Sequence, residues 1–109
     1  MQYHLKAVDV RFIALVKQRQ FRDAANLLPE VEDINVCDTE TGFTALHIVA
    51  LCSAVKLFKE IEKRPDLDYG AVDYKGRSAA LLACIHGCND ELAFALLQKE
   101  QEHSLRKRL

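Results

Sequence analysis

The sequence has no excess of charge of either sign and no long apolar run. Its 109 residues carry 15 Lys and Arg against 16 Asp and Glu, so the net charge of −1 gives no reason to expect nucleic acid or an anionic membrane as a partner. No apolar stretch approaches the length of a membrane span. The first residues show no basic segment followed by an apolar one, so we expect no secretory signal and a cytoplasmic protein.

The sequence also lacks the common signatures of catalysis. There is no glycine-rich phosphate loop, no pair of catalytic carboxylates and no serine in a nucleophile elbow. We therefore expect no enzyme activity, no cofactor and no small-molecule substrate. A hydrophobic content of 50% and a charged content of 28% are typical of one globular domain, and we assign residues 1–109 to it.

The four cysteines give no clear metal or disulfide pattern. They stand at positions 37, 52, 84 and 88, and no strict Cys-x-x-Cys pair exists. In Cys84-Ile-His-Gly-Cys88 a glycine interrupts the helix between the two thiols, which works against a tetrahedral zinc site. We expect reduced cysteines and no bound metal, with Cys84 packed in the core and Cys88 beginning a helix. The alternative is a small thiol- or zinc-dependent protein that uses Cys52, Cys84, Cys88 and His86.

The first third of the chain is helical in pattern. Apolar residues recur there at steps of three and four, the spacing of one helix face, at Leu5, Val8, Phe12, Leu15 and Val16. Arg19-Gln20 interrupts the pattern, and a second, shorter apolar face follows over residues 21–28. Pro29 closes this second helix.

Two later segments are copies of one pattern. Asp38-Thr-Glu-Thr-Gly-Phe-Thr-Ala-Leu-His precedes Asp73-Tyr-Lys-Gly-Arg-Ser-Ala-Ala-Leu-Leu, and Thr44 and Ser78 are 34 residues apart. Asp38 and Asp73 are 35 apart, because the first copy has one extra residue before its glycine. Each copy predicts a turn at the glycine, a helix capped by Thr or Ser, a break and a second helix.

These signals predict helices over residues 45–52 and 79–86. The breaks after them fall at Ser53-Ala54 and at Gly87, and Asp90 is expected to cap the last helix. The expected core includes Leu46, Leu57, Ile61, Leu92 and Leu96. The last helix is expected to present an apolar face made of Leu92, Phe94, Ala95, Leu96 and Leu97, and to continue into the charged segment 101–109.

A unit of this length that opens on Asp, Gly and Thr resembles the ankyrin repeat. The resemblance implies an all-α solenoid of three stacked helix-turn-helix repeats, at about 5–37, 38–72 and 73–100, with short β-turn fingers and a charged tail at 101–109. In that family the Thr and His of the Thr-Pro-Leu-His motif link adjacent repeats by hydrogen bonds. Thr44 and His47 match these positions, whereas the third unit has Leu81 in place of the histidine.

The same resemblance implies a protein-interaction module that binds through its fingers and the concave face of its inner helices. The corresponding finger residues are Thr39, Glu40, Phe43, Tyr74, Lys75 and Arg77. The inner-helix positions are Leu51, Cys52, Ile85 and His86, with Lys17 and Gln18 from the first pair. Two alternatives remain open: Phe43 and Tyr74 pack across neighbouring fingers, or the chain is a spacer within a larger protein.

Overall fold

Six α-helices make up most of the part of the chain that the computed structural model describes, residues 6–108, with side chains described to residue 106. Its helices are α1 (Ala7–Lys17), α2 (Phe21–Leu27), α3 (Ala45–Cys52), α4 (Val55–Ile61), α5 (Ala79–His86) and α6 (Asp90–Arg108), with a 3-10 turn at Leu28–Glu30. In the described range no helix is long and apolar enough to cross a membrane. Leu5, which belongs to the predicted first face, lies outside the described residues.

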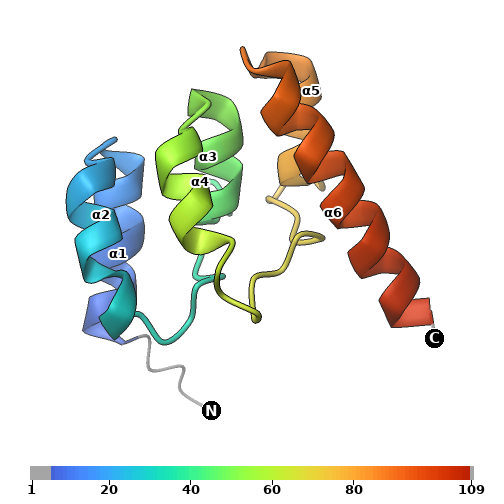
Figure 1. Ribbon diagram of the computed structural model, residues 1–109. Helices are drawn as coiled ribbons and strands as arrows, with labels where there is room; N and C mark the ends of the chain where they lie inside the picture. The colour runs from blue at the N-terminus through green and yellow to red at the C-terminus, as the bar shows by residue number, and fades with distance from the viewer. Residues whose placement is uncertain (1–5, 109) are drawn as a thin grey trace.

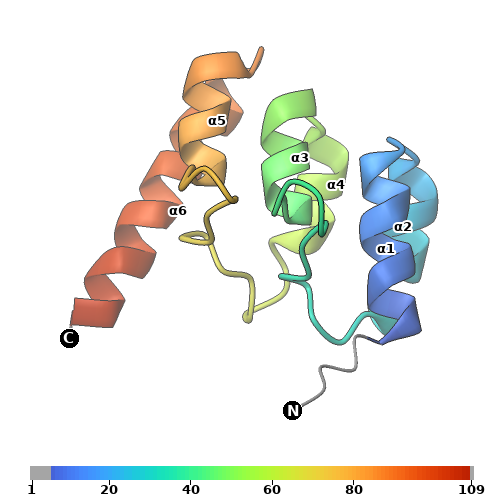
Figure 2. The ribbon, with the colours of Figure 1, turned by 180° about the vertical axis from the view of Figure 1, so that it is seen from behind.

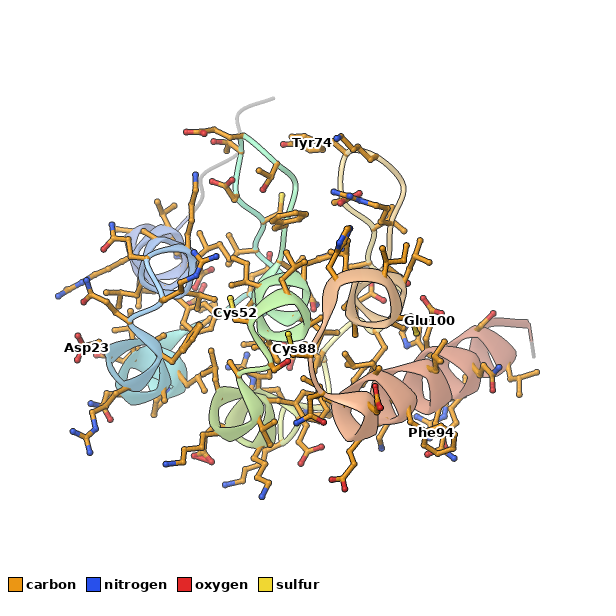
Figure 3. The ribbon with its side chains drawn as sticks, turned by 90° about the horizontal axis from the view of Figure 1, so that it is seen from above. Asp23, Cys52, Tyr74, Cys88, Phe94 and Glu100 are labelled. Carbon is orange, nitrogen blue, oxygen red and sulfur yellow. The ribbon has the colours of Figure 1, made fainter. Side chains whose placement is uncertain are left out.

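The helices form two rows (Figures 1 and 3). The inner row is α1, α3 and α5, and the outer row is α2, α4 and α6. Helix α3 contacts both α1 and α5, and each inner helix contacts the outer helix that follows it. Two loops project from the inner row, in front of α3 and α5 in Figure 2. We call residues 37–44 the first finger and residues 72–78 the second finger.

Local signals explain where the inner helices begin and end. The predicted bounds 45–52 and 79–86 are confirmed. The hydroxyl of Thr44 faces the backbone N–H of His47, and that of Ser78 accepts from the N–H of Leu81. Helix α3 ends at Cys52, and the next residue, Ser53, has a φ of 53°, in the left-handed region that commonly terminates a helix.

The fingers are closed by backbone hydrogen bonds, with one isolated bridge in each, Cys37 with Thr44 and Val72 with Ser78. Gly42 donates to the carbonyl of Asp38 four residues back, whereas Gly76 donates to Asp73 three residues back. The extra residue before Gly42 is therefore accommodated by a wider turn. Both glycines have positive φ, 76° and 77°.

The core lies between the two rows. The five apolar residues predicted to be buried are confirmed: Leu46, Leu57, Ile61, Leu92 and Leu96. Burying a large aliphatic side chain contributes roughly 1.5–3 kcal/mol, so these side chains stabilise the packing between the rows. Asp9 is also buried, and its two carboxylate oxygens accept hydrogen bonds from the N–H groups of Glu32 and Asp33.

Several expectations about the last two helices are wrong. Phe94 and Leu97 were expected to share one apolar face of α6 with Leu92 and Leu96, but both are exposed, because the helix packs through Leu92, Ala93 and Leu96. Cys84 is exposed rather than in the core, because it lies on a side of α5 that no described helix covers.

The start of the last helix also differs from what the sequence predicted. Its first turn is capped by Asn89, whose side-chain oxygen accepts from the N–H of Leu92, and not by Asp90, which is the first helical residue. Cys88 therefore precedes the helix instead of beginning it.

Helix α6 continues to Arg108, as its helix-forming residues predicted. Its second half passes the loop that follows α4, and there the Nε2 atom of His103 lies 2.9 Å from a carboxylate oxygen of Asp68. The charged segment 101–108 is therefore the last part of α6.

Candidate interaction surface

The candidate site is the face formed by the two fingers and the inner row of helices (Figure 2). Most of the predicted residues on it are exposed: Thr39, Glu40, Tyr74, Lys75, Ile85 and His86. Phe43, Leu51, Cys52 and Arg77 are half-buried, and Lys17 and Gln18 are exposed at the end of α1. The structure therefore brings the predicted positions to one side of the molecule, with different degrees of exposure.

Phe43 is not the exposed finger aromatic that we expected. It is half-buried against the core, and its ring stacks on the ring of His47, with 5.7 Å between centroids. The guanidinium of Arg77 lies 5.9 Å from the centre of the Phe43 ring. Phe43 is thus part of a packed cluster with His47 and Arg77, because the wider first finger folds its aromatic residue back over the start of α3.

Arg77 also holds its own finger together. Its Nε donates to Oδ2 of Asp73 at 2.8 Å, while Oδ1 of that carboxylate accepts from the N–H groups of Lys75 and Arg77. Burial acts to raise the pKa of Asp73, but these hydrogen bonds outweigh it, so the pKa lies below its ordinary value. Arg77 is therefore a structural residue as well as a half-exposed one.

Tyr74 connects the two fingers. Its backbone N–H donates to the carbonyl of Thr41 at 3.2 Å, and its ring lies against the backbone of Gly42. The side chain nevertheless remains 65% exposed at the tip of the second finger (Figure 3). Tyr74 therefore packs across the two fingers and also leaves most of its side chain exposed to solvent.

The first finger is linked to α1 through charge. The ammonium of Lys17 lies 3.2 Å from Oδ1 of Asp38 and 3.5 Å from a carboxylate oxygen of Glu40. The hydrogen bond to Asp38 raises the pKa of Lys17. Partial burial acts to raise the pKa of Asp38, but hydrogen bonds from Thr41 and Lys17 outweigh it, and the pKa is lowered. Both groups are therefore charged at neutral pH.

Two hollows lie beside this ion pair. One, of about 520 Å³, is lined by apolar side chains of α1 and of the segment leading into the first finger, among them Val10, Ile13 and Val36. The other, of about 170 Å³, lies between the end of α1 and α3, over Phe43, Ile48 and Leu51. Lys17 and Asp38 line both. We call the smaller hollow, which lies between α1 and α3, the α1–α3 groove.

Sequence reasoning missed Arg19 as a residue of this groove. Arg19 has a φ of 62°, a left-handed conformation that is uncommon outside glycine, and it forms the turn between α1 and α2. The interruption at Arg19-Gln20 was visible in the sequence as a break in the apolar pattern. Its place in the lining of a hollow shared with Phe43 was not, because that depends on how α1 packs beside α3.

The thiols do not assemble into a site in the described part of the chain. The four cysteines are free, with Cys37, Cys84 and Cys88 exposed and Cys52 half-buried. Across residues 6–106, where side chains are described, no three histidine, cysteine or acidic side chains come together as metal ligands. Cys52 lines the α1–α3 groove, whereas Cys88 lies beside Ser53, whose hydroxyl accepts from the Cys88 N–H at 3.3 Å.

Comparison with known proteins finds no similar protein. The chain matches no protein-family model, no curated protein and no solved structure. The resemblance to the ankyrin repeat rests on the residue pattern itself, from Asp38 to Ala50 and from Asp73 to Cys84.

Proposed function

We propose that this chain is a non-enzymatic, cytoplasmic protein-interaction module, built as an ankyrin-like solenoid of three stacked helix-turn-helix repeats. It binds a partner protein through its two fingers and the inner row of helices. The geometry of Thr44 and His47 supports the repeat assignment, because the histidine joins its own finger to the next one through the carbonyl of Arg77.

One observation carries the binding proposal: the inner face exposes large apolar side chains at positions that the backbone holds firmly. Tyr74 is 65% exposed and Ile85 is 58% exposed. The backbone of Tyr74 is bonded to the first finger, and Ile85 lies on helix α5. Exposed aromatic and aliphatic anchors on a rigid support are typical of binding hot spots.

The test is affinity capture from a lysate of the cells that express the protein. The finger variant replaces Tyr74 and Lys75 by Ala and keeps Arg77, because Arg77 bonds the buried carboxylate of Asp73 and its loss would also lower stability. The control variant replaces Phe94 and Lys99 by Ala on the outer side of α6, where Phe94 is just as exposed at 63% (Figure 3). Both double variants remove one exposed aromatic ring and one exposed cation.

We expect the finger variant to bind its partners at least about 2 kcal/mol more weakly, while the control binds as wild type does. Circular dichroism verifies that both variants fold. Equal capture by all three proteins would reject this surface. If only the variant at Phe94 and Lys99 fails to capture partners, the interface lies on α6.

The same protein preparations also test the two alternative functions. A spacer within a larger protein would capture no partner through any of these surfaces. A thiol- or zinc-dependent protein that used Cys52, Cys84, Cys88 and His86 would retain about one zinc per chain when purified without chelator, and metal analysis measures this directly.

A further inference from the structure

Helix α6 carries exposed apolar side chains along its outer side. Phe94 is 63% exposed and Leu105 is 60% exposed, and Leu97 is exposed as well. With 3.6 residues per turn, these three positions fall within about 80° of one another around the helix axis. The neighbouring positions on this side hold the uncharged and exposed Gln98 and Gln101. We call these five residues the α6 stripe.

The rest of the described chain packs on the opposite side of α6. Leu92 and Leu96 are buried there. His103 contacts Asp68, and it lies half a turn around the helix from Phe94, which is nine residues earlier. Phe94 is on the side of α6 that faces away from the inner row, and the second half of the helix slants away from the other helices (Figures 1 and 3). The α6 stripe is therefore accessible along its length.

The order of residues along the stripe is self-complementary. In an antiparallel pair of α6 helices, Phe94 of one copy can lie opposite Leu105 of the other. The same register places Gln98 of one copy opposite Gln101 of the other, and their side-chain amides can donate to and accept from each other. One register thus covers the apolar residues at both ends of the stripe and pairs the polar residues in its middle.

The charges at the two ends of α6 favour the same antiparallel order. The first turn holds Asp90 and Glu91, while the sequence of the last turn is Arg106-Lys107-Arg108. Among the side chains of residues 6–106, Asp90, Glu91 and Arg106 take part in no ion pair. Antiparallel packing brings the acidic end of each copy to the basic end of the other, whereas parallel packing brings like charges together. A second copy therefore offers the complementary charge at both ends.

We propose that the α6 stripe joins two copies of this chain in an antiparallel, two-fold symmetric dimer. The proposal goes beyond binding through the fingers, which lie on the other side of the molecule and stay free for a partner (Figure 3). From Phe94 to Leu105 the stripe is about 17 Å long. Because such an interface is small, the dimer forms only at micromolar and higher concentrations.

The experiment measures the mass of the full-length chain by sedimentation velocity, at concentrations from about 1 µM to about 1 mM. The test variant carries Phe94→Ala and Leu105→Ala. The control variant carries Tyr74→Ala and Ile85→Ala, which also removes one aromatic and one aliphatic side chain of nearly the same exposure, 65% and 58%. Circular dichroism verifies that all three proteins are folded.

We expect the wild type and the control variant to change from one chain to two chains as the concentration rises. The dimer of the test variant should be about tenfold or more weaker, because its apolar contacts are removed. Added salt should weaken the wild-type dimer, because Asp90, Glu91 and Arg106 are exposed.

An exchange of charges tests the antiparallel order. One variant carries Asp90→Lys and Glu91→Lys, and the other carries Arg106→Glu, Lys107→Glu and Arg108→Glu. Each variant alone should dimerise about tenfold more weakly than the wild type, because like charges then meet at both ends. When the two are mixed, with one of them fluorescently labelled, they should form a heterodimer, because opposite charges meet at both ends.

The proposal is overturned if the wild type remains a single chain at the highest concentration, or if the test variant dimerises as strongly as the wild type. It is also overturned if each charge variant alone dimerises as well as the wild type, the result expected of a parallel pair, or if the two variants do not pair with each other. A dimer lost only in the control variant would show that copies meet through the fingers. Capture of a partner is measured with the variant at Tyr74 and Lys75, so either proposal can fail while the other stands.

Discussion

His47 Nε2 lies 2.9 Å from the carbonyl oxygen of Arg77, thirty residues further along the chain. On the other side of the ring, Nδ1 accepts a hydrogen bond from the backbone N–H of Thr44 at 3.0 Å. Nδ1 must therefore be unprotonated, and Nε2 carries the proton that it donates to Arg77. The ring is fully buried and links the start of α3 to the second finger in its neutral form.

This geometry predicts that stability falls as the pH is lowered through the range in which histidine titrates. Burial lowers the pKa of His47 below its ordinary value of 6.5, and the hydrogen bond to Arg77 opposes this only in part. At a pH below this ordinary pKa, the unfolded chain binds a proton at His47 more readily than the folded chain does, so the free energy of unfolding decreases. At a pH above the ordinary pKa, the neutral His47 makes its full contribution to stability.

The measurement is the melting temperature of the wild type and of His47→Asn between about pH 7.5 and pH 5, a range centred near the unperturbed histidine pKa. The wild type should lose more stability over this range than the variant, whose amide does not titrate. Parallel curves for the two proteins would show that His47 is not held neutral.

Removal of the helix cap should weaken the middle unit. Thr44→Ala deletes the hydroxyl that faces the N–H of His47 at 3.5 Å and its ring at 2.9 Å. We expect a loss of roughly 1 kcal/mol in the free energy of unfolding, measured by denaturant titration. Thr39→Ala, at an exposed position of the same finger, should change it by less than about 0.5 kcal/mol. An unchanged midpoint in Thr44→Ala would contradict the capping role.

Arg77→Ala should destabilise the protein although the residue lies on the candidate surface. It leaves the side chain of Asp73, only 1% exposed, without its guanidinium partner, at a cost of about 1.5–3 kcal/mol. Lys75→Ala, two residues away in the same finger, should cost less than about 0.5 kcal/mol. Equal melting temperatures for the two variants would show that the ion pair between Arg77 and Asp73 contributes nothing to stability.

The two finger glycines should differ in their tolerance of a methyl group. Alanine at either position has to adopt a positive φ, at a cost of about 1–2 kcal/mol. At Gly42 a Cβ atom would also lie 2.6 Å from Cδ1 and 2.8 Å from the backbone nitrogen of Tyr74, whereas at Gly76 it meets open space. Gly42→Ala should therefore be clearly less stable than Gly76→Ala. The reverse order would mean that the fingers do not touch.

The buried side of α6 can be distinguished from its exposed side by truncation. Leu96→Ala should cost about 2–5 kcal/mol, because the side chain is 1% exposed within the core. Phe94→Ala removes a larger side chain but should cost less than about 1 kcal/mol, since it is exposed. Similar costs at the two positions would show that α6 packs in a different orientation.

The helix boundaries could be derived from the sequence because their causes are local. Thr44 and Ser78 satisfy free N–H groups within one turn, and Ser53 and Gly87 interrupt helices at the predicted positions. The choice of Asp90 instead of Asn89 as a cap was an error of one residue, since both side chains can accept the same hydrogen bond.

The candidate site was less accessible to sequence reasoning. The pattern placed Tyr74, Lys75 and Ile85 on the surface, and they are exposed. It also placed Phe43 in solvent, although that ring packs on His47. The periodicity of one helix does not reveal which residues a distant segment covers, and Arg19 became a groove residue only through the packing of α1 beside α3.

The sequence by itself determined the helices, the two turns that need glycine and five of the leucine and isoleucine positions of the core. These follow from capping, from backbone sterics and from apolar spacing, each of which acts over a few residues. Only the tertiary structure decided that Cys84 and Phe94 face solvent while Phe43 is covered. Burial depends on which elements pack against a side chain, and those neighbours come from distant parts of the chain.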